Sequence, residues 1–458
     1  MKRASGDSGA ANAEGVLEAP TLREEGDPQQ DMRSGWVAVL NRGATWVTDH
    51  ELWLVAVVVC ILVFPSLVPE PLIPLALLLI PTSWLCRRVA KGYLTVRTCL
   101  DGPVVALLAM IPVGLYASAD PDLSFPIVHK MMAEVALFYG MVNSIRPLKQ
   151  VRRFVAPLLG MSAGISVLGL LGTDWHPGKA GFLPPVFLQV YDHLPHVIIP
   201  PLNEAGFSPN IVGGTLAMLF PVTLAFFLRG SSRMVRSVLG LSLLVMGFTL
   251  LFTLSRGAWM GLVAALLCMA IWRSRWFLLA IPILMALTLL VVQRVGLEPV
   301  ADFMLATHST TSMASRAEVW QRAIYMIQDF PYTGIGLGTF SRVGPAMYPY
   351  FLAGWDADIP HAHNIFLQAG VDFGLPGLVA FTGVVAASAF MAWDAARLAR
   401  QSDLEPLAIG LFCGFIAYLT HGLFDSITAV SIKAGVVLWA FLGFTAALWR
   451  SLKADPLT

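Results

Sequence analysis

Two histidines stand directly before a long apolar segment, in the run His361-Ala362-His363-Asn364. An imidazole at the water edge of a membrane helix can gain or lose a proton near neutral pH. We therefore expect His363 to act as a general base, with His361 and the amide of Asn364 available to orient its ring. The alternative is a structural histidine that caps the helix or contacts lipid headgroups.

Two arginines are candidates for binding an anion. Arg256 lies between two apolar segments, within Ser255-Arg256-Gly257, where the alternative is snorkelling to lipid headgroups. Arg316 follows Ser315, which as a helix N-cap would leave free backbone N–H groups beside the guanidinium. Guanidinium groups bind phosphate in a planar, bidentate manner. Arg322 lies in the same segment and is a weaker candidate, because surface arginines more often contact headgroups. Base and cations together predict an anionic, lipid-borne substrate.

Two further polar pairs have helical spacing. His421 and Asp425 are four residues apart at the end of an apolar segment, so the carboxylate could orient an imidazole, or the pair could simply cap the helix. Lys130 and Glu134 have the same spacing in an apolar segment and are expected to neutralise each other. No set of His, Cys and carboxylate side chains has metal-ligand spacing, so we predict no metal and no cofactor.

The composition identifies the environment in which these residues act. Of the 458 residues, 56% are hydrophobic and 13% are charged, and the mean hydropathy is +0.69. This is too apolar for a soluble fold, so the chain is expected to be an all-α integral membrane protein. A net charge of +1 gives no reason to expect a nucleic-acid partner. The five cysteines are expected to be core residues, neither paired in disulfides nor bound to metal.

About twelve apolar segments are long enough to be membrane-spanning helices. Their expected ranges are 52–68, 72–85, 100–118, 128–143, 154–172, 211–228, 237–254, 259–271, 277–292, 365–393, 407–424 and 434–449. The second and the eighth are the weakest of these assignments. Lys and Arg accumulate at every second junction, which predicts that both termini are cytoplasmic.

These spans divide the chain into regions. The expected order is a disordered cytoplasmic tail at 1–35, helices 1–9 within 36–292 with an extracytoplasmic loop at 173–210, a long extracytoplasmic loop at 293–364, helices 10–12 within 365–449, and a cytoplasmic tail at 450–458. In the long loop, residues 315–330 predict a short amphipathic helix. The run Gly334-Ile335-Gly336-Leu337-Gly338 predicts a tight turn packed on the helices, since no strand precedes it as a nucleotide loop requires.

His363, Asn364, Gly374 and Gly377 together match a longer pattern, His-[Asn/Ser/Gln]-x9-Gly-x-x-[Gly/Thr/Tyr]. This pattern resembles that of the O-antigen ligase and polymerase superfamily of bacterial envelope glycosyltransferases. The other features that resemble this family are Ser208-Pro209-Asn210, Ser255-Arg256-Gly257, Ser315 and Arg316 with Trp320, the glycine run at 334–338, and His421 with Asp425. The resemblance extends from about Ser208 to Asp425.

The resemblance implies a GT-C-like fold in the bacterial inner membrane with an active site that faces the periplasm. It also implies transfer of a glycan from undecaprenyl diphosphate to an acceptor hydroxyl without ATP or metal. Since no carboxylate pair suggests a covalent sugar intermediate, an in-line attack would invert the anomeric carbon. His363 would be the base. The expected substrate-binding residues are Arg256, Arg316, Arg322, Asn364 and His361, and the expected supporting residues are Ser255, Ser315, Trp320, Asn210, His421, Asp425, Gly374 and Gly377.

Three activities within that family differ in the acceptor of the glycan. A ligase uses lipid A-core, a polymerase uses another lipid-linked repeat unit, and a protein O-oligosaccharyltransferase uses a Ser or Thr side chain. Twelve helices with one long loop late in the chain are most similar to a ligase, so the expected partners are the undecaprenyl diphosphate-linked glycan, lipid A-core and membrane lipids. Outside the family, the alternative is a twelve-helix transporter of a lipid-linked glycan.

Overall fold

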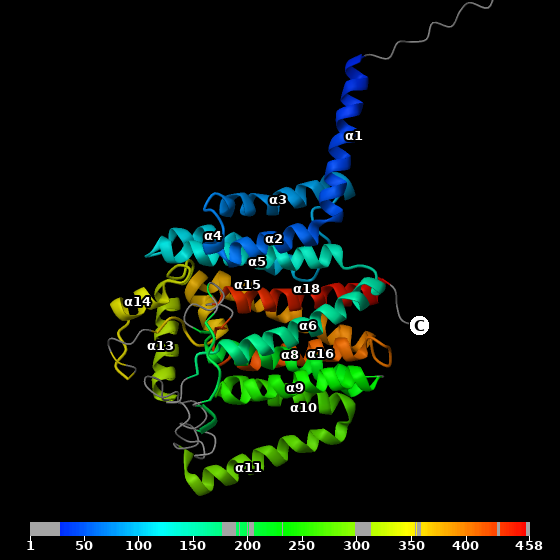
Figure 1. Ribbon diagram of the computed structural model, residues 1–458. Coiled ribbons are helices and arrows are strands. Elements are labelled where there is room, and N and C mark those ends of the chain that lie inside the picture. Colours follow the sequence, from blue (N-terminus) through cyan, green and yellow to red (C-terminus); the bar gives the residue numbers. More distant parts are fainter. Residues whose placement is uncertain are drawn as a thin grey trace, which may run out of the picture.

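The computed structural model describes residues 28–175, 189–191, 193–198, 200, 206–230, 232–297, 313–352, 354, 359–427 and 431–454. Within these ranges every element is helical (Figure 1). The helices are α1 (Pro28–Asp49), α2 (Glu51–Val63), η1 (Pro65–Leu67), α3 (Leu72–Lys91), α4 (Asp101–Tyr116), α5 (Pro121–Ser144), α6 (Leu148–Gly172), α8 (Pro209–Arg229), α9 (Arg233–Phe252), α10 (Arg256–Arg273), η3 (Arg275–Leu279), α11 (Ala280–Val295), α13 (Met313–Asp329), α14 (Phe340–Met347), α15 (Ile365–Leu398), α16 (Glu405–Gly422) and α18 (Ile432–Ala454).

Each apolar segment expected from the sequence is helical, which confirms an all-α fold. Among the described helices, nine are long and apolar enough to cross a membrane, or ten if the pair bent by 66° at the α1–α2 junction forms one span. The expected number of about twelve stays a prediction, because α4 is short for a spanning helix and α16 does not belong to the nine. The cytoplasmic location of both termini also stays a prediction.

The buried core lies where α5, α8, α16 and α18 pack together. Of the residues in the most apolar stretch of α18, 78% are buried. In the span formed by η3 and α11, none of the residues in the corresponding stretch is buried. Figure 1 accordingly shows α11 along the outer edge of the bundle. A helix that is apolar all round and exposed in the monomer is suited to contact with lipid.

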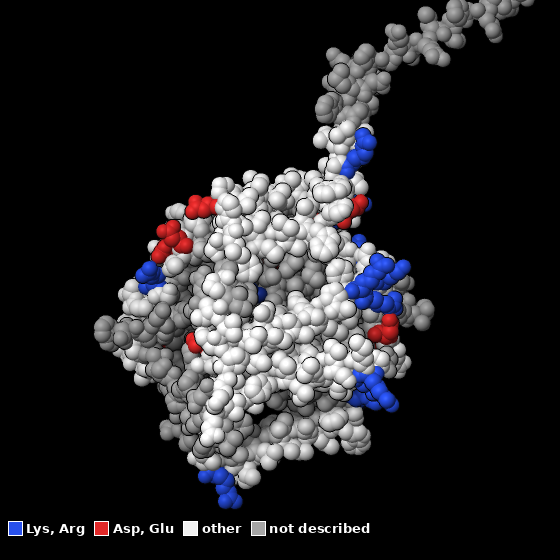
Figure 2. All heavy atoms as spheres, in the orientation of Figure 1, with Lys and Arg blue, Asp and Glu red and all other residues white. Residues whose placement is uncertain are grey.

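Basic residues gather at one end of the bundle, as Figure 2 shows. Two contacts at this end each join a helix to a loop. Arg450 donates to the backbone oxygen of Arg97 at 2.6 Å, and Arg152 forms an ion pair with Asp403 at 2.7 Å. The broad surface between this end and the opposite one is mostly uncharged (Figure 2). This distribution is typical of a membrane protein with one basic face.

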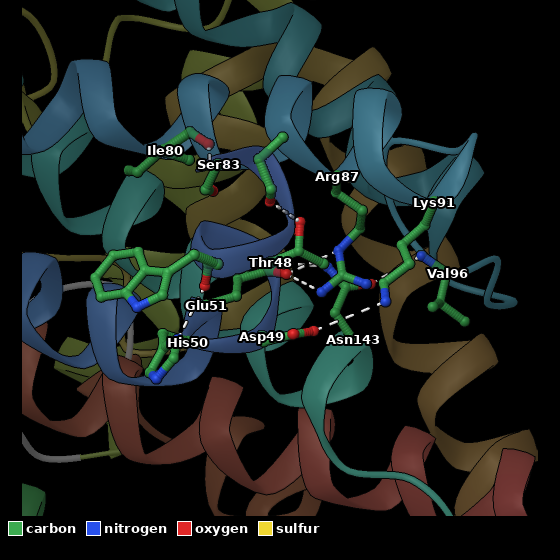
Figure 3. Close-up of polar contacts among 12 residues, drawn as sticks. Thr48, Asp49, His50, Glu51, Ile80, Ser83, Arg87, Lys91, Val96 and Asn143 are labelled. Carbon is green, nitrogen blue, oxygen red and sulfur yellow. Dashed lines mark hydrogen bonds and ion pairs between the residues drawn. The ribbon is translucent and has the colours of Figure 1, made fainter. Parts of the chain in front are cut away.

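A buried polar cluster, which the sequence reasoning missed, fixes the N-terminal helices (Figure 3). Arg87 of α3 donates from Nε to Oε2 of Glu51 in α2 at 2.7 Å, and Asn143 of α5 donates to Oε1 of Glu51 at 2.7 Å. Asn143 in turn accepts from the backbone N–H of Val96 at 2.9 Å. Because both charges are buried and paired, loss of either partner would leave an uncompensated charge inside the fold.

The described part of the long loop region packs against α15. The amphipathic segment forms α13, and Gly334, Gly336 and Gly338 adopt positive φ angles in a turn that packs on the bundle. A Cβ at Gly334 would lie 2.4 Å from the backbone oxygen of Val371, so this approach requires glycine. Gly374 has φ 70° and interrupts α15 at the same place, where Leu375 donates to the oxygen of Pro331 at 2.7 Å. Gly334 and Gly374 therefore allow the backbone of the turn to lie directly against the backbone of α15.

Candidate active site

The loop before α15 holds two histidine rings against each other. Asn364 is the N-cap of α15, and its side chain accepts from the backbone N–H groups of Phe366 and Leu367 at 2.9 and 3.1 Å. His363 has φ 50°, a conformation that non-glycine residues rarely adopt. Its N–H donates to Nδ1 of His361 at 3.1 Å, and the ring centroids lie 4.2 Å apart. Backbone strain of this kind often accompanies functional sites.

Asp425, just after α16, contacts both rings. Its Oδ1 atom lies 3.6 Å from Nε2 of His361 and 3.6 Å from Nδ1 of His363. Its Oδ2 atom accepts from the amide of Asn210 in α8 at 2.8 Å, and Oδ1 accepts from the backbone N–H of Ser426 at 2.7 Å. Three separate parts of the chain therefore meet at this carboxylate.

The local environment determines the charge of two of these groups. Burial, repulsion from His363 and the positive charge of Arg316 lower the pKa of His361 to about 3, although Asp425 opposes the shift. Burial acts to raise the pKa of Asp425, but its interactions with His363, His361 and His421 outweigh burial and hold that pKa well below its usual range. Hydrogen bonds from Asn210 and Ser426 also favour the charged carboxylate. At neutral pH, His361 is thus neutral and Asp425 is ionised.

Arg316 brings a buried cation to the same place. Its Nη1 atom donates to the backbone oxygen of Phe424 at 3.0 Å, the residue is only 8% exposed, and Asp425 attracts its guanidinium. Arg256, at the first position of α10, is close enough to Arg316 for the two charges to repel each other. The structure therefore places Arg316 and His363 beside Asp425, and Arg256 within electrostatic range of Arg316.

Ser315 is not the N-cap that the sequence predicted. The helix begins at Met313, so Ser315 lies in the first turn of α13 and is buried. Arg316 consequently follows it inside the helix rather than at its start. Ser255, in contrast, does occupy the N-cap position of α10, although its side chain makes no capping hydrogen bond.

Arg322 faces a different environment from Arg316. It forms an ion pair with Glu318 of the same helix at 3.5 Å, and its guanidinium lies 5.6 Å from the ring of Phe351. Glu318 also accepts from the backbone N–H groups of Phe351 and Leu352, both at 2.8 Å. These contacts tie Arg322 to the packing of α13, and its role in binding substrate stays a prediction. Trp320 is partly buried, and its Nε1 atom has no partner among the described residues.

No hydrogen bond or ion pair joins the side chains of His421 and Asp425, although the two interact electrostatically. The buried ring of His421 packs where α8 and α10 have glycines: a Cβ at Gly214 would lie 2.8 Å from Cε1, and a Cβ at Gly257 would lie 3.2 Å from Cδ2. The carboxylate of Asp425 is directed to the loop histidines. The four-residue spacing of His421 and Asp425 therefore did not predict the two histidines that lie nearest to this carboxylate.

A buried polar side chain that was not predicted from the sequence forms a hydrogen bond with the loop that carries His361 and His363. Gln368, one turn into α15, accepts from the backbone N–H of Ala362 at 2.8 Å and donates to Oδ1 of Asp372 at 2.9 Å. Asp372 also accepts from Gly338 of the glycine turn at 3.3 Å. The expected pair of Lys130 and Glu134 is present, with Nζ and Oε1 3.8 Å apart, and both residues line the same buried pocket as Asp372. The four-residue spacing of Gln368 and Asp372 in α15 could have predicted from the sequence that these two side chains contact each other.

His361, His363 and Asp425 lie close enough together to act as metal ligands. Their spacing in the sequence did not predict a metal site. Their potential ligand atoms all lie within 4.8 Å of one another. The positive charge of Arg316 acts on the same atoms, because it disfavours protonation of His361. The same repulsion would weaken the binding of a metal cation.

An apolar pocket of about 260 Å³ lies beside α8. It is lined mostly by aliphatic side chains of α6, α8 and α18, together with Phe64, Phe207 and Lys433. The ammonium of Lys433 lies 5.8 Å from the ring of Phe64 and 5.7 Å from that of Phe207. Such a pocket is suited to a hydrocarbon chain that ends in an anionic group.

The fold and the site define a multi-pass membrane protein with cations, an imidazole and a carboxylate gathered near the ends of its helices. Residues 241–382 match the family model described as O-Antigen ligase. This segment of the chain is therefore similar to the O-antigen ligase family, whose members are glycosyltransferase-like enzymes of the ligase and polymerase type. The matched range includes Arg256, Arg316 and His363. No curated protein matches the chain.

Proposed function

We propose that this protein is an O-antigen ligase, which transfers a glycan from undecaprenyl diphosphate to an outer-core sugar hydroxyl of lipid A-core at the periplasmic face of the inner membrane. The observation that carries the proposal is the approach of His363 and Arg316 to one buried carboxylate, Asp425. A base and a guanidinium in one site match the two requirements of the reaction. These are removal of a proton from the acceptor and stabilisation of the leaving diphosphate.

His363 acts as the general base in this mechanism. Its Nδ1 atom faces Oδ1 of Asp425 at 3.6 Å, so Nε2 is the nitrogen available to the acceptor. The ionised carboxylate stabilises the imidazolium that forms when Nε2 takes the hydroxyl proton. A distance of 3.6 Å is longer than a hydrogen bond, and we expect it to shorten once the ring is protonated.

The arginines bind the diphosphate. The Nε atom of Arg316 is buried and has no hydrogen-bond partner among the described residues, so the guanidinium retains donor capacity. Buried donors without a partner in the free protein are typical of sites completed by a ligand. Arg256 lies near enough to share the charge of the same diphosphate, and an anion between the two guanidinium groups would relieve their repulsion.

The bonds change in one displacement. The acceptor oxygen attacks the anomeric carbon of the donor, the carbon–oxygen bond to the diphosphate breaks, and undecaprenyl diphosphate leaves with the bonding electrons. The hydroxyl proton passes to His363. In-line attack inverts the anomeric configuration, and the donor supplies the energy, so neither ATP nor a metal is required. The apolar pocket with Lys433 is suited to the first isoprene units of the donor.

The test uses purified full-length protein in detergent with lipid-linked glycan and lipid A-core, with EDTA present and without ATP. We expect glycan to appear on the core and free undecaprenyl diphosphate to be released. His363→Ala should abolish transfer, while His193→Ala, an exposed histidine of another loop, should keep it. Lengthening of the lipid-linked glycan without transfer to the core would identify a polymerase instead. Movement of an unchanged lipid-linked glycan would identify a transporter.

A further inference from the structure

An open pocket of about 850 Å³ lies far from the candidate active site, at the basic end of the bundle. It is formed by the C-terminal ends of α8 and α10, by η3 and by the start of α16. Arg256 begins α10, whereas Arg273 at its other end lines this pocket. At 1.5 Å per residue, the 18 residues of α10 separate the two sites by roughly 27 Å. The donor site and this pocket are therefore distinct.

Three arginines converge on the pocket from separate segments: Arg229, Arg273 and Arg400. Glu405 is the acidic residue in the lining, and it is already engaged. Its Oε2 atom lies 3.2 Å from Nη1 of Arg229 and accepts from the backbone N–H of Gln401 at 3.1 Å. One carboxylate against three guanidinium groups leaves the pocket with an excess of positive charge.

The rest of the pocket wall is apolar. Leu228, Met269, Phe277 and Ile409 line it, and the guanidinium of Arg400 lies 5.5 Å from the ring of Trp272. Phe277 belongs to η3, whose large apolar side chains are exposed at the surface of the bundle. A ligand here would meet cations at one end and hydrocarbon at the other.

We infer that this pocket binds an anionic phospholipid, with the phosphate of the headgroup held by Arg273 and Arg400 and an acyl chain along the wall of Met269 and Ile409. Basic pockets between helices at the membrane surface are suited to anionic headgroups. Guanidinium groups hold phosphate by bidentate hydrogen bonds. A zwitterionic headgroup fits less well, because its ammonium would face the same arginines while Glu405 is paired with Arg229.

The general excess of basic residues at this end does not by itself require a site, so the experiment compares two pairs of arginines. Arg273→Gln with Arg400→Gln removes the proposed phosphate ligands. Arg233→Gln with Arg236→Gln removes the same charge from exposed positions of α9 that do not line the pocket. Full-length protein is placed in nanodiscs of phosphatidylcholine containing phosphatidylglycerol, and the lipids retained after transfer to detergent are counted by native mass spectrometry.

We expect the wild type and the Arg233/Arg236 variant to retain phosphatidylglycerol in preference to phosphatidylcholine. Each pocket arginine should contribute about fivefold to that preference, so the Arg273/Arg400 variant should lose most of it. Quenching of Trp272 fluorescence by brominated phosphatidylglycerol, judged against Trp272→Phe, should disappear in the same variant. Equal loss in both double variants would show only a general effect of charge and would overturn the proposal. Glycan transfer is assayed in parallel, since a failure of lipid retention with transfer intact would leave the proposed function untouched.

Discussion

The side-chain oxygen of Gln368 accepts a hydrogen bond from the backbone N–H of Ala362, the residue between the two histidines of the site. Gln368 is buried in α15, and its amide also donates to Asp372. The position of His363 therefore depends on a side chain within the bundle that touches neither Asp425 nor the arginines. Gln368 is a positioning residue in the proposed reaction.

Substitution of Gln368 by Leu should lower kcat about 10- to 100-fold while KM for the donor changes little, because such supporting contacts orient the reacting group without binding substrate. Steady-state kinetics with varied donor concentration measures the two constants separately. Gln321→Leu, on the exposed face of α13, is the matched control and should leave both unchanged. An increase in KM with unchanged kcat would contradict a positioning role.

Arg316→Lys should reduce kcat on the order of a hundredfold or more, because an ammonium keeps the charge but cannot reproduce a bidentate guanidinium that also donates to Phe424. Arg322→Lys is the control from the same helix and should stay within a few-fold of the wild type. Single-turnover assays on both variants, with thermal midpoints to verify folding, make the comparison. If the two variants behave alike, the assignment of Arg316 to the diphosphate is wrong.

The low pKa of His361 predicts a pH effect on stability. In the folded protein that pKa is about 3, whereas in the unfolded chain it is about 6.5. Between these values the unfolded state binds more protons, so stability falls as the pH decreases, by at most about 1.4 kcal/mol per pH unit. Asp425 has the same sign of linkage but acts at lower pH, since its depressed pKa stabilises the fold above about pH 4 and that contribution is lost only below this value.

The window from pH 6.5 to pH 4.5 thus lies above the range in which the contribution of Asp425 is lost. Thermal midpoints of purified protein should decrease across this window, and the decrease should be shallower in His361→Gln. Parallel curves for the two proteins would show that His361 is not buried in its neutral form.

Gly214→Ala should destabilise the protein by roughly 1–3 kcal/mol through overpacking. The new methyl group would lie 2.8 Å from Cε1 of His421 and 2.6 Å from Cδ1 of Ile427. Gly247→Ala in α9 is the matched control, because its Cβ would lie 3.9 Å from Phe220, and it should be neutral or stabilising by about 0.5–1 kcal/mol. Thermal unfolding in detergent compares the two, and a tolerated alanine at 214 would mean that His421 can move aside.

Most helices were predictable from the sequence because apolar length alone identifies a spanning segment. The N-cap at Ser315 was wrong because the apolar and polar pattern of a surface helix does not fix its first residue to within two positions. Gly374 illustrates the same limit, since the interruption of α15 depends on the approach of Pro331 from another segment.

The site was predictable in its residue types more than in its contacts. His363, Arg256 and Arg316 were all identified, but the partner of Asp425 was assigned from helix spacing to His421, whereas the chain folds the loop histidines onto it. Arg322 could have been separated from Arg316 by sequence alone, because Glu318 precedes Arg322 by one helical turn and pairs with it. Gln368 was missed although Asp372 follows it by four residues on the same helix face, because its contact with Ala362 depends on the fold of the preceding loop.

Asn210, Arg256, Arg316, His363 and Asp425 come from five separate parts of the chain, and Asp425 is the last of them to leave the ribosome. During synthesis the arginines and histidines enter the membrane before the carboxylate that gathers them. A partly inserted chain therefore has no assembled candidate site, even when every helix before α16 is in the bilayer. In the proposed reaction, donor lipid in the same membrane is therefore safe from the enzyme until α16 has been inserted and packed.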